Sequence, residues 1–157
     1  MNRKDREVKD ITDVIDILKR CHTIRLGLIN KDNAYVVPVS FGLDVVDGQV
    51  VIYFHGAAAG LKVDCLTQNN RICIEADIFY KVESTNAGIT ARYESVIGVG
   101  IVNKVEGKEK LYGLRKLVEH YGYNDYPIER CKGLDNTAVY KIAISEISGK
   151  RNLPSSD

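Results

Sequence analysis

The sequence predicts a mostly β fold of the α+β class, in which an antiparallel barrel carries helices at its periphery. Runs of alternating apolar and polar residues follow one another along the chain and are joined by short turns, as in antiparallel sheets. The helical segments interrupt these runs and do not alternate with them, which argues against a doubly wound parallel sheet. Gly98 and Gly100 stand inside the longest run, where a barrel strand must bend or approach its neighbour closely.

Length and composition limit the classes of function. The 157 residues have the size of one domain, and 45% hydrophobic with 27% charged residues is ordinary for a soluble globular protein. A net charge of +1 creates no field that would attract nucleic acid or an anionic membrane, so neither is an expected partner. No apolar run is long enough to span a bilayer, and the charged N-terminus is not a signal peptide. We therefore expect a single domain, residues 1–157, in the cytoplasm.

The four cysteines do not form a metal or redox motif. Cys21, Cys65, Cys73 and Cys131 include no pair with C-x-x-C spacing. Cys65 and Cys73 lie in apolar segments and are expected to be buried thiols. A disulfide framework is not expected in a cytosolic chain with a core of this size. The sequence therefore predicts no metal site.

Nine segments of the chain have the periodicity of regular structure. Alternation of apolar and polar residues predicts strands at 23–29, 34–43, 71–79 and 90–105. A continuous run of β-branched and aromatic residues predicts a buried strand at 50–54, and a further strand is predicted at 138–147. Apolar residues spaced three and four apart predict helices at 12–21, 57–66 and 108–120, the first with Thr12 as its N-cap. Polar composition predicts a charged segment at 1–10 that lies across the surface or a partner subunit, loops at 80–89 and 121–134, and a polar tail from Ser148.

The strand predicted at 34–43 has an unusual composition. Pro38 cannot donate a hydrogen bond to a ladder, so the strand lies at an edge of the sheet or is bulged at this residue. Ser40 and Gly42 share the face of Pro38, so this side leaves room for a neighbour. Bulges often stand beside binding sites, although an ordinary edge strand explains the proline more simply.

The stretch from Val50 to Leu66 carries the strongest signal for a binding site. A buried strand runs into small residues between Gly56 and Gly60 and then into a helix. Backbone N–H groups point outward at such a turn, which suits an anion such as phosphate, and Lys62 adds a positive charge. The spacing Gly-x-x-x-Gly-x-Lys lacks one residue of the Walker A motif and the Ser or Thr after its lysine, so a nucleoside triphosphatase is not expected. The alternative is that the two glycines only relieve steric crowding in a tight turn.

Taken together, these motifs resemble the pyridoxamine phosphate oxidase-related family of FMN-binding split-barrel proteins, and within it the nitroimidazole-resistance branch. The resemblance follows the order of that family over nearly the whole chain, at Arg3–Glu7, Ile24–Gly27, Val37–Phe41, Tyr53–Ala57, Gly60–Lys62, Arg92–Gly100, Val139–Tyr140 and Ser148–Lys150. It implies a six-stranded antiparallel split β-barrel, a homodimer, and FMN bound at the dimer interface.

The resemblance also implies a cofactor site built from three parts of the chain. The FMN ring would lie along one strand, its phosphate beside the glycine-rich turn, and residues of the longest strand would approach from the same or the second subunit. In chain order these residues are Val37, Pro38, Val39, Ser40, Phe41, His55, Gly56, Ala57, Gly60, Lys62, Tyr93 and Ser95. The backbone groups of Val39 and Ser40 would meet the polar edge of the ring.

Two classes of function follow from this cofactor. A flavin-dependent reductase would use FMN to reduce a small electron acceptor, such as a nitroaromatic or quinone-like compound. A non-catalytic protein would hold FMN or haem as a sensor or reserve, and bleaching of a flavin band by NAD(P)H would separate the two classes. The chain lacks the extended C-terminus of a pyridoxamine phosphate oxidase, which makes that activity the weaker alternative. Glu94 stands where a basic or neutral residue is more usual in that family, so the resemblance does not decide which substrate the site takes.

Several polar residues admit a structural role beside a functional one. His55 is the best candidate for a catalytic group because it adjoins the proposed phosphate turn, although it could simply end a strand. His22 and His120 are expected to be structural, the latter because it suits the C-terminal end of a helix dipole. Arg25 could reach a phosphate or cover the rim of the barrel. Lys150 lies in the predicted tail, where we expect no role in the site.

Overall fold

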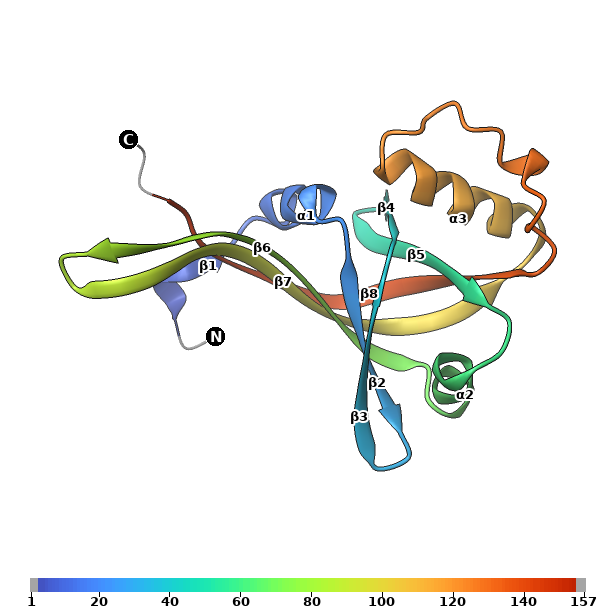
Figure 1. Cartoon of the computed structure of the whole chain (residues 1–157), viewed down its shortest axis with the longest axis horizontal. Coiled ribbons are helices and arrows are strands. Elements are labelled where there is room, and N and C mark those ends of the chain that lie inside the picture. Colours follow the sequence, from blue (N-terminus) through green and yellow to red (C-terminus); the bar gives the residue numbers. More distant parts are fainter. Residues whose placement is uncertain (1–2, 155–157) are drawn as a thin grey trace.

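The computed structural model describes residues 3–154, which form one antiparallel sheet with three α-helices around it (Figure 1). The strands are β1 (Glu7–Val8), β2 (Ile24–Asn30), β3 (Asn33–Val39), β4 (Gly42–Val46), β5 (Gln49–Ala57), β6 (Arg71–Thr85), β7 (Gly88–Val105) and β8 (Thr137–Asn152). The helices are α1 (Ile11–Arg20), α2 (Leu61–Gln68) and α3 (Gly107–His120), with 3-10 turns at Lys4–Arg6 and Ile128–Arg130. No helix within residues 3–154 is long and apolar enough to cross a membrane.

The sheet confirms the predicted mostly β, antiparallel architecture. Its strand order is β3-β2-β6-β7-β8-β5-β4, and β1 pairs with β8 outside this path. All pairings are antiparallel. The sheet does not close, because β3 and β4 lie at opposite ends of the path, as expected for a split barrel. Each of the six predicted strands is present, but the run predicted at 34–43 divides into β3 and β4 at Ser40 and Phe41.

The apolar core lies on one face of the curled sheet. Ile52 and Phe54 of β5 and Ile142 of β8 are fully buried members of a single cluster. The apolar side of α1 joins this cluster through Ile17 and Leu18, which are also fully buried. Full burial of such a side chain contributes about 1.5–3 kcal/mol, so the cluster is the main source of the stability of the barrel.

The first helix starts one residue earlier than predicted, and its N-cap is Asp10, so the assignment of the cap to Thr12 is wrong. The Asp10 carboxylate accepts hydrogen bonds from both the N–H and the hydroxyl of Thr12, each at 2.9 Å. Aspartate and threonine are both good N-caps. The sequence alone therefore does not decide between two such residues placed two positions apart.

The two glycines inside β7 lie close to the backbone of β8, as predicted, and a bulge adjoins them. The register between β7 and β8 shifts between Val99 and Gly100. A Cβ atom on Gly100 would collide with the backbone of Ala143, and one on Gly98 would lie 3.2 Å from the Glu146 carbonyl oxygen. Glycine therefore lets β7 follow β8 closely while the sheet bends.

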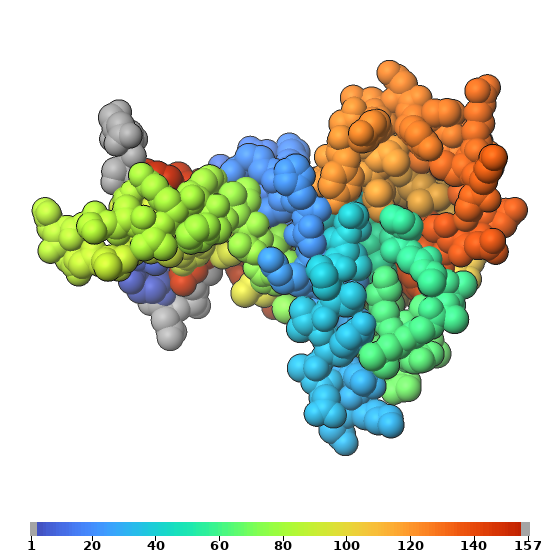
Figure 2. Space-filling view, viewed as in Figure 1, coloured from blue at the N-terminus to red at the C-terminus, as the bar shows by residue number. Residues whose placement is uncertain are grey.

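Two segments predicted as a loop and a tail are strands. β6 continues through the predicted loop at 80–89 as far as Thr85, and β7 begins at Gly88. β8 continues through the predicted tail to Asn152, which lies opposite Tyr93. The long hairpin extends away from the rest of the molecule as an arm (Figures 1 and 2). Its polar composition misled the prediction, because a two-stranded extension leaves many of its side chains in water.

The two cysteines predicted to be buried differ. Cys65 is buried, whereas Cys73 is exposed, so the prediction for Cys73 is wrong. Its neighbours Ile72 and Ile74 point into the core, and alternation along β6 places Cys73 on the opposite face of the sheet. An apolar run does not reveal which of its residues take the outer face.

Candidate functional site

The predicted site is centred on the end of β5 and the start of α2. Ala57 is the last residue of β5, where it pairs with Thr137 of β8, and α2 begins at Leu61. The helix start predicted at Ala57 is therefore wrong, because strand pairing extends beyond the apolar run. Gly60 is the N-cap of α2 and has a φ of 123°, a conformation that residues with a side chain rarely adopt.

The N-terminus of α2 has no side-chain cap, because Gly60 offers no oxygen to the first turn. The Asp64 N–H donates to the Gly60 carbonyl oxygen at 3.1 Å and so closes that turn. The N–H groups before it, on Leu61 to Val63, point out of the helix end. The peptide dipoles add a partial positive charge at the same place. An anion here would accept hydrogen bonds and neutralise that charge.

Lys62 brings a full positive charge to this helix end. Its Nζ atom lies 5.3 Å from the centre of the Phe54 ring and 2.8 Å from the point that a Cβ on Gly56 would occupy. Burial lowers the pKa of this half-buried lysine. None of the ion pairs found within residues 3–154 involves Lys62. The ammonium group is thus partly withdrawn from water without a carboxylate to compensate its charge.

His55 faces a different environment from its neighbours on β5. Phe54 points into the core, and alternation turns His55 to the other face, where it helps to line a cavity of about 300 Å³. The wall of this cavity is mainly apolar and includes Leu114, Leu117, Val118, Ile128 and Leu134, together with Tyr126, Cys131, Gly133 and Thr137. Partial burial against the cavity wall lowers the pKa of His55, and the charge of Lys62 lowers it further, so both effects favour the neutral form of the ring. It can therefore donate one hydrogen bond and accept another.

The split in the barrel opens beside this strand end. The ladder between β4 and β5 ends at the pair Gly42 and Tyr53, so the chain preceding Gly42 no longer follows β5 toward His55. That preceding segment leads back into β3, an edge strand, as Pro38 predicted. Backbone N–H and C=O groups on the outer edge of such a strand have no partner strand and are available to a ligand.

The five residues predicted to run along the cofactor ring lie in different environments. Pro38 and Ser40 are exposed, and Val37 and Val39 are half-buried. Phe41 is fully buried, with its ring centre 4.3 Å from that of His120. The side chain of Phe41 therefore belongs to the core, and only its backbone remains a candidate for the site.

Tyr93 and Ser95 lie far from His55 within one chain. On β8, Ser95 lies opposite Lys150 and His55 lies opposite Val139, and eleven residues of strand span roughly 36 Å. Figure 1 shows the same separation, with the arm and α2 at opposite ends of the molecule. A site that includes all the predicted residues must therefore be built from two chains.

Lys150 belongs to β8, and its Nζ atom lies 5.8 Å from the centre of the Tyr93 ring. Burial raises the pKa of Tyr93, but hydrogen bonds with Arg6 and Lys150 outweigh this effect and leave the pKa below its usual value. Because Lys150 lies in a strand, the expectation that it lies in a polar tail is wrong. Two cations flank the hydroxyl group of Tyr93 instead.

Two other candidates have structural partners. Arg25 forms ion pairs with Glu75 at 2.7 Å and with Asp77 at 2.5 Å, which favours its role at the rim over a phosphate contact. The Nε2 atom of His120 lies 2.8 Å from the carbonyl oxygen of Cys21, which joins α3 to the end of α1. The structural assignment of His120 is confirmed.

Glu94 is part of a buried network that the sequence did not reveal. Its side chain is 3% exposed, accepts a hydrogen bond from the Tyr80 hydroxyl at 2.5 Å, and pairs with Arg20 of α1 at 2.6 Å. Burial raises the pKa of Glu94, but these two partners outweigh that effect and leave it below its usual value. Alternation along β7 could have found this network, since Glu94 shares a face with Val96 of the core. Glu94 therefore points into the protein.

Known proteins share this architecture. A candidate 5-nitroimidazole antibiotic resistance protein from Bacteroides thetaiotaomicron has 26% sequence identity and a TM-score of 0.79, over 92% of this chain and 85% of that chain. The flavocytochrome Anf3 from Azotobacter vinelandii has 21% identity and a TM-score of 0.73, over 96% and 72%. The FAD and haem binding protein from Mycobacterium smegmatis has 17% identity and a TM-score of 0.78, over 97% and 77%. At these identities, the last two show similarity of fold alone.

Sequence comparisons give the family. Curated protein sequences yielded no match. The family model described as pyridoxamine 5'-phosphate oxidase matches residues 10–151, which is most of the chain. The match includes the end of β5, the start of α2 and the segment that contains Tyr93 and Ser95. The chain therefore belongs to the pyridoxamine 5'-phosphate oxidase family.

Proposed function

We propose that this protein binds FMN between two copies of the chain and reduces a small electron acceptor, such as a nitroaromatic or quinone-like compound. One observation gives the proposal its strongest support. The half-buried ammonium group of Lys62 has no carboxylate partner within residues 3–154 and lies at an uncapped helix N-terminus. A phosphate group would supply the missing negative charge and accept the N–H groups of the first turn.

The residues at this strand end fit a phosphate group. Gly56 has no side chain, so the Lys62 ammonium can extend across the strand at this point. The end of α2 presents N–H groups, and the edge of β3 at Val39 and Ser40 presents backbone donors and acceptors for a polar ring edge. Family membership favours a flavin phosphate over another anion.

The outer face of the sheet supports a dimer. Ile97, Val99 and Ile101 of β7 are 52%, 37% and 42% exposed, and Cys73 pairs with Val99 beside them. On the other side of Cys73, the register leads through Gly27 to Val36, which is 60% exposed. Soluble monomers rarely expose a continuous apolar patch of this kind. A second copy on this face would cover the patch and bring Tyr93 and Ser95 of one chain to the site of the other.

FMN would supply the transfer of electrons or hydride, and the protein would supply binding and orientation. The cavity beside His55 is our candidate for the position of the acceptor. Its apolar wall suits a small ring compound, and the neutral imidazole can donate a hydrogen bond to an oxygen of that compound. A volume of about 300 Å³ is at the small end for ligand pockets, which favours a single or fused ring over a haem macrocycle.

The absorption spectrum of the purified protein tests this proposal. We expect a bound-flavin band that NAD(P)H or dithionite bleaches and that returns when a nitroimidazole or a quinone is added without oxygen. A band that bleaches with dithionite and does not return with any acceptor would favour a sensor or a flavin reserve. A protein that takes up no FMN at micromolar concentrations would contradict the proposal.

A further inference from the structure

A second cavity, of about 140 Å³, lies between α2 and the inner faces of β7 and β8. It shares no lining residue with the cavity beside His55. Its wall comes from one face of the helix and from the two neighbouring strands, and consists of Val63, Leu66, Thr67, Val102, Lys104 and Tyr140. A cavity of about 150 Å³ can hold benzene, so this one has room for about six non-hydrogen atoms.

Lys104 and Tyr140 lie directly opposite each other in the ladder between β7 and β8. Side chains paired in this way point to the same face of the sheet, and alternation along β7 makes this the face of the core residue Val102. On its other side Tyr140 pairs with Phe54 of β5, and the two rings stack with their centres 5.0 Å apart. The cavity wall therefore presents a hydroxyl group and an ammonium group side by side.

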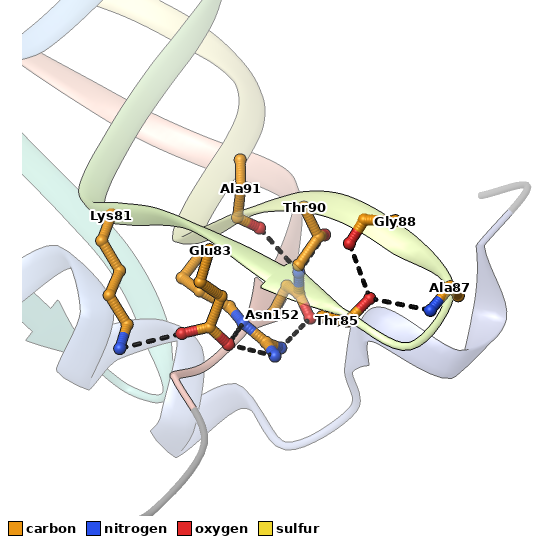
Figure 3. A network of polar contacts seen from close by, with 9 residues as sticks. Lys81, Glu83, Thr85, Ala87, Gly88, Thr90, Ala91 and Asn152 are labelled. Carbon is orange, nitrogen blue, oxygen red and sulfur yellow. Dashed lines mark hydrogen bonds and ion pairs between the residues drawn. The ribbon is translucent and has the colours of Figure 1, made fainter.

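The hydroxyl group of Tyr140 lacks the partner that polar side chains have elsewhere in the protein. On the arm, the Glu83 carboxylate pairs with Lys81 at 2.8 Å (Figure 3). On α3, the Tyr112 hydroxyl donates to Asp44 at 2.7 Å. Tyr140 is only 4% exposed, and its hydroxyl makes no hydrogen bond with residues 3–154.

The free hydroxyl of Tyr140 faces the cavity. Within the described part of the chain, no side-chain oxygen that is cut off from solvent lacks a partner, so the Tyr140 oxygen still reaches solvent. The cavity that Tyr140 lines provides this contact. Burial is the largest effect on the pKa of Tyr140 and raises it, whereas the charge of Lys104 lowers it. The hydroxyl is thus a hydrogen-bond donor that a ligand in the cavity can use.

Lys104 can serve the same ligand. Its ammonium group pairs with Glu106 at 2.7 Å, but these two side chains are 54% and 64% exposed. An ion pair this open to water contributes little to stability and holds neither side chain firmly. The ammonium group also has three N–H donors, so the contact with Glu106 leaves others for a second acceptor.

The wall of the cavity is fixed before any ligand arrives. Val102 donates its N–H to the Asn70 carbonyl oxygen at 2.9 Å, and the Asn70 side-chain amide donates to the Val102 carbonyl oxygen at 3.2 Å. These bonds tie β7 to the segment that follows α2. Leu66 and Val102 are also members of the core cluster. A ligand would therefore pay little to order this site.

We propose that this cavity binds a short-chain carboxylate, with butyrate as the size that fits best. The Tyr140 hydroxyl and the Lys104 ammonium group donate to the two carboxylate oxygens. The alkyl chain lies against Val63, Leu66 and Val102, the apolar part of the wall. A neutral apolar guest would leave both donors without an acceptor, and a nucleotide would exceed the volume.

Titration of the full-length protein with sodium butyrate, followed by two-dimensional NMR, tests the proposal. We expect saturable shifts centred on the cavity wall, with a Kd in the millimolar range for a ligand of this size. Each methylene removed, from butyrate to propionate to acetate, should weaken binding about fourfold because less apolar wall is covered. Butyramide has the same shape without the charge and should bind about tenfold more weakly. Absence of saturable shifts, or equal affinity for butyrate and butyramide, would overturn the proposal.

Variants of the wall test the role of each donor. Tyr140→Phe removes one hydroxyl and should weaken butyrate binding about fivefold, and Lys104→Met about tenfold. Tyr53→Phe is the matched control, because Tyr53 is 2% exposed, has no hydrogen bond from its hydroxyl to residues 3–154, and does not line the cavity. Its affinity should equal that of the wild type, and a loss as large as that of Tyr140→Phe would overturn the proposal. Thr67→Leu keeps a good helix former, fills the cavity from α2 and should abolish binding.

A last pair of variants separates this site from the proposed phosphate site. Lys62→Met should leave butyrate affinity unchanged, and Lys104→Met should leave FMN affinity unchanged. Loss of butyrate binding in Lys62→Met but not in Lys104→Met would place the carboxylate at the start of α2 and overturn the proposal. A protein that binds butyrate through Lys104 but takes up no FMN would contradict the function proposed above and support this site.

Discussion

Two charged side chains of this protein are withdrawn from water, and they differ in what surrounds them. Glu94 is 3% exposed and has two partners, the guanidinium of Arg20 and the hydroxyl of Tyr80. Lys62 is half-buried, lies over the Phe54 ring, and takes part in none of the ion pairs seen in residues 3–154. The partners lower the pKa of Glu94 despite its burial, whereas burial lowers the pKa of Lys62.

This difference distinguishes a charged side chain that stabilises the fold from one that binds a ligand. Burying a charge costs stability unless a partner compensates it, so folded proteins normally provide that partner within the chain. Glu94 follows this rule and fastens α1 to the barrel through Arg20. Lys62 departs from it, which is expected when the compensating charge arrives with a ligand.

Removal of Glu94 should have the largest effect on stability. Glu94→Ala leaves Arg20 and Tyr80 without their shared partner, and we expect the free energy of unfolding to fall by about 3 kcal/mol. Urea unfolding followed by circular dichroism measures this loss. Glu106, an exposed residue whose carboxylate pairs with Lys104 at 2.7 Å, gives the control. Glu106→Ala should have little effect on the free energy of unfolding. Equal losses for the two variants would mean that Glu94 is no more important for stability than an exposed ion pair.

His55 sharpens the comparison because it lies beside Lys62 and because the charge of Lys62 helps to lower its pKa. His55→Ala should leave a folded dimer whose acceptor reduction falls about tenfold, as expected for the loss of a hydrogen-bond donor that acts near the reaction. His55→Asn keeps a hydrogen-bonding group and should restore more of the flavin binding than of the turnover. His120→Ala should instead lower the melting temperature, since His120 packs on Phe41 in the core. Wild-type affinity and turnover in a folded His55→Ala dimer would remove His55 from the site.

The pH dependence of stability tests the partners of Glu94. Because its pKa in the folded protein lies below the usual 4.5, Glu94 stabilises the fold fully above that pH. This contribution disappears as the pH falls through the lower, folded-state pKa. Glu94→Gln should therefore show less loss of stability between pH 5 and pH 3 than the wild type in urea unfolding. Parallel curves for the two proteins would mean that Arg20 does not hold the Glu94 charge.

Gly56 offers the mildest way to disturb Lys62. A Cβ atom at this position would lie 2.8 Å from the Lys62 Nζ atom, which is the flexible end of a side chain and can move aside. Gly56→Ala should therefore change the free energy of unfolding by less than about 1 kcal/mol. We expect FMN affinity to fall a few-fold because the ammonium group is displaced, and isothermal titration would detect this. Unchanged affinity would mean that the position of the ammonium group does not matter for binding.

Much of the barrel could be predicted from the sequence because its signals are local. The run of β-branched and aromatic residues in β5, the alternation along β7, and the turn at Asp47 and Gly48 depend on neighbouring residues. The arm could not be predicted in this way, because its strands depend on contacts such as that between Asn152 and Thr90, which are 62 positions apart. The choice of Asp10 as the cap of α1 and the exposure of Cys73 likewise depend on how the chain packs.

The candidate site likewise combines features that the local sequence predicts with features that depend on how the chain folds. The glycine turn and Lys62 predict an anion from local chemistry, and the end of β5 brings them together. The lack of a carboxylate near Lys62 is a property of the folded chain that no spacing reveals. The cavity beside His55 depends on α3 and on the loop that the sequence left without structure. The distance between Tyr93 and His55 emerges only from the register of β8.

The affinities of Lys62→Met for FMN and for riboflavin test most directly whether Lys62 awaits a phosphate. Methionine keeps an apolar stem over the Phe54 ring and removes the charge, so the apoprotein should be at least as stable as the wild type. A charge-assisted contact contributes about 1.5–3 kcal/mol, so FMN affinity should fall roughly ten- to a hundredfold. Riboflavin has no phosphate, and its affinity should not change. Equal losses for both ligands, or a marked loss of stability in the apoprotein, would show that Lys62 is a structural charge like Glu94.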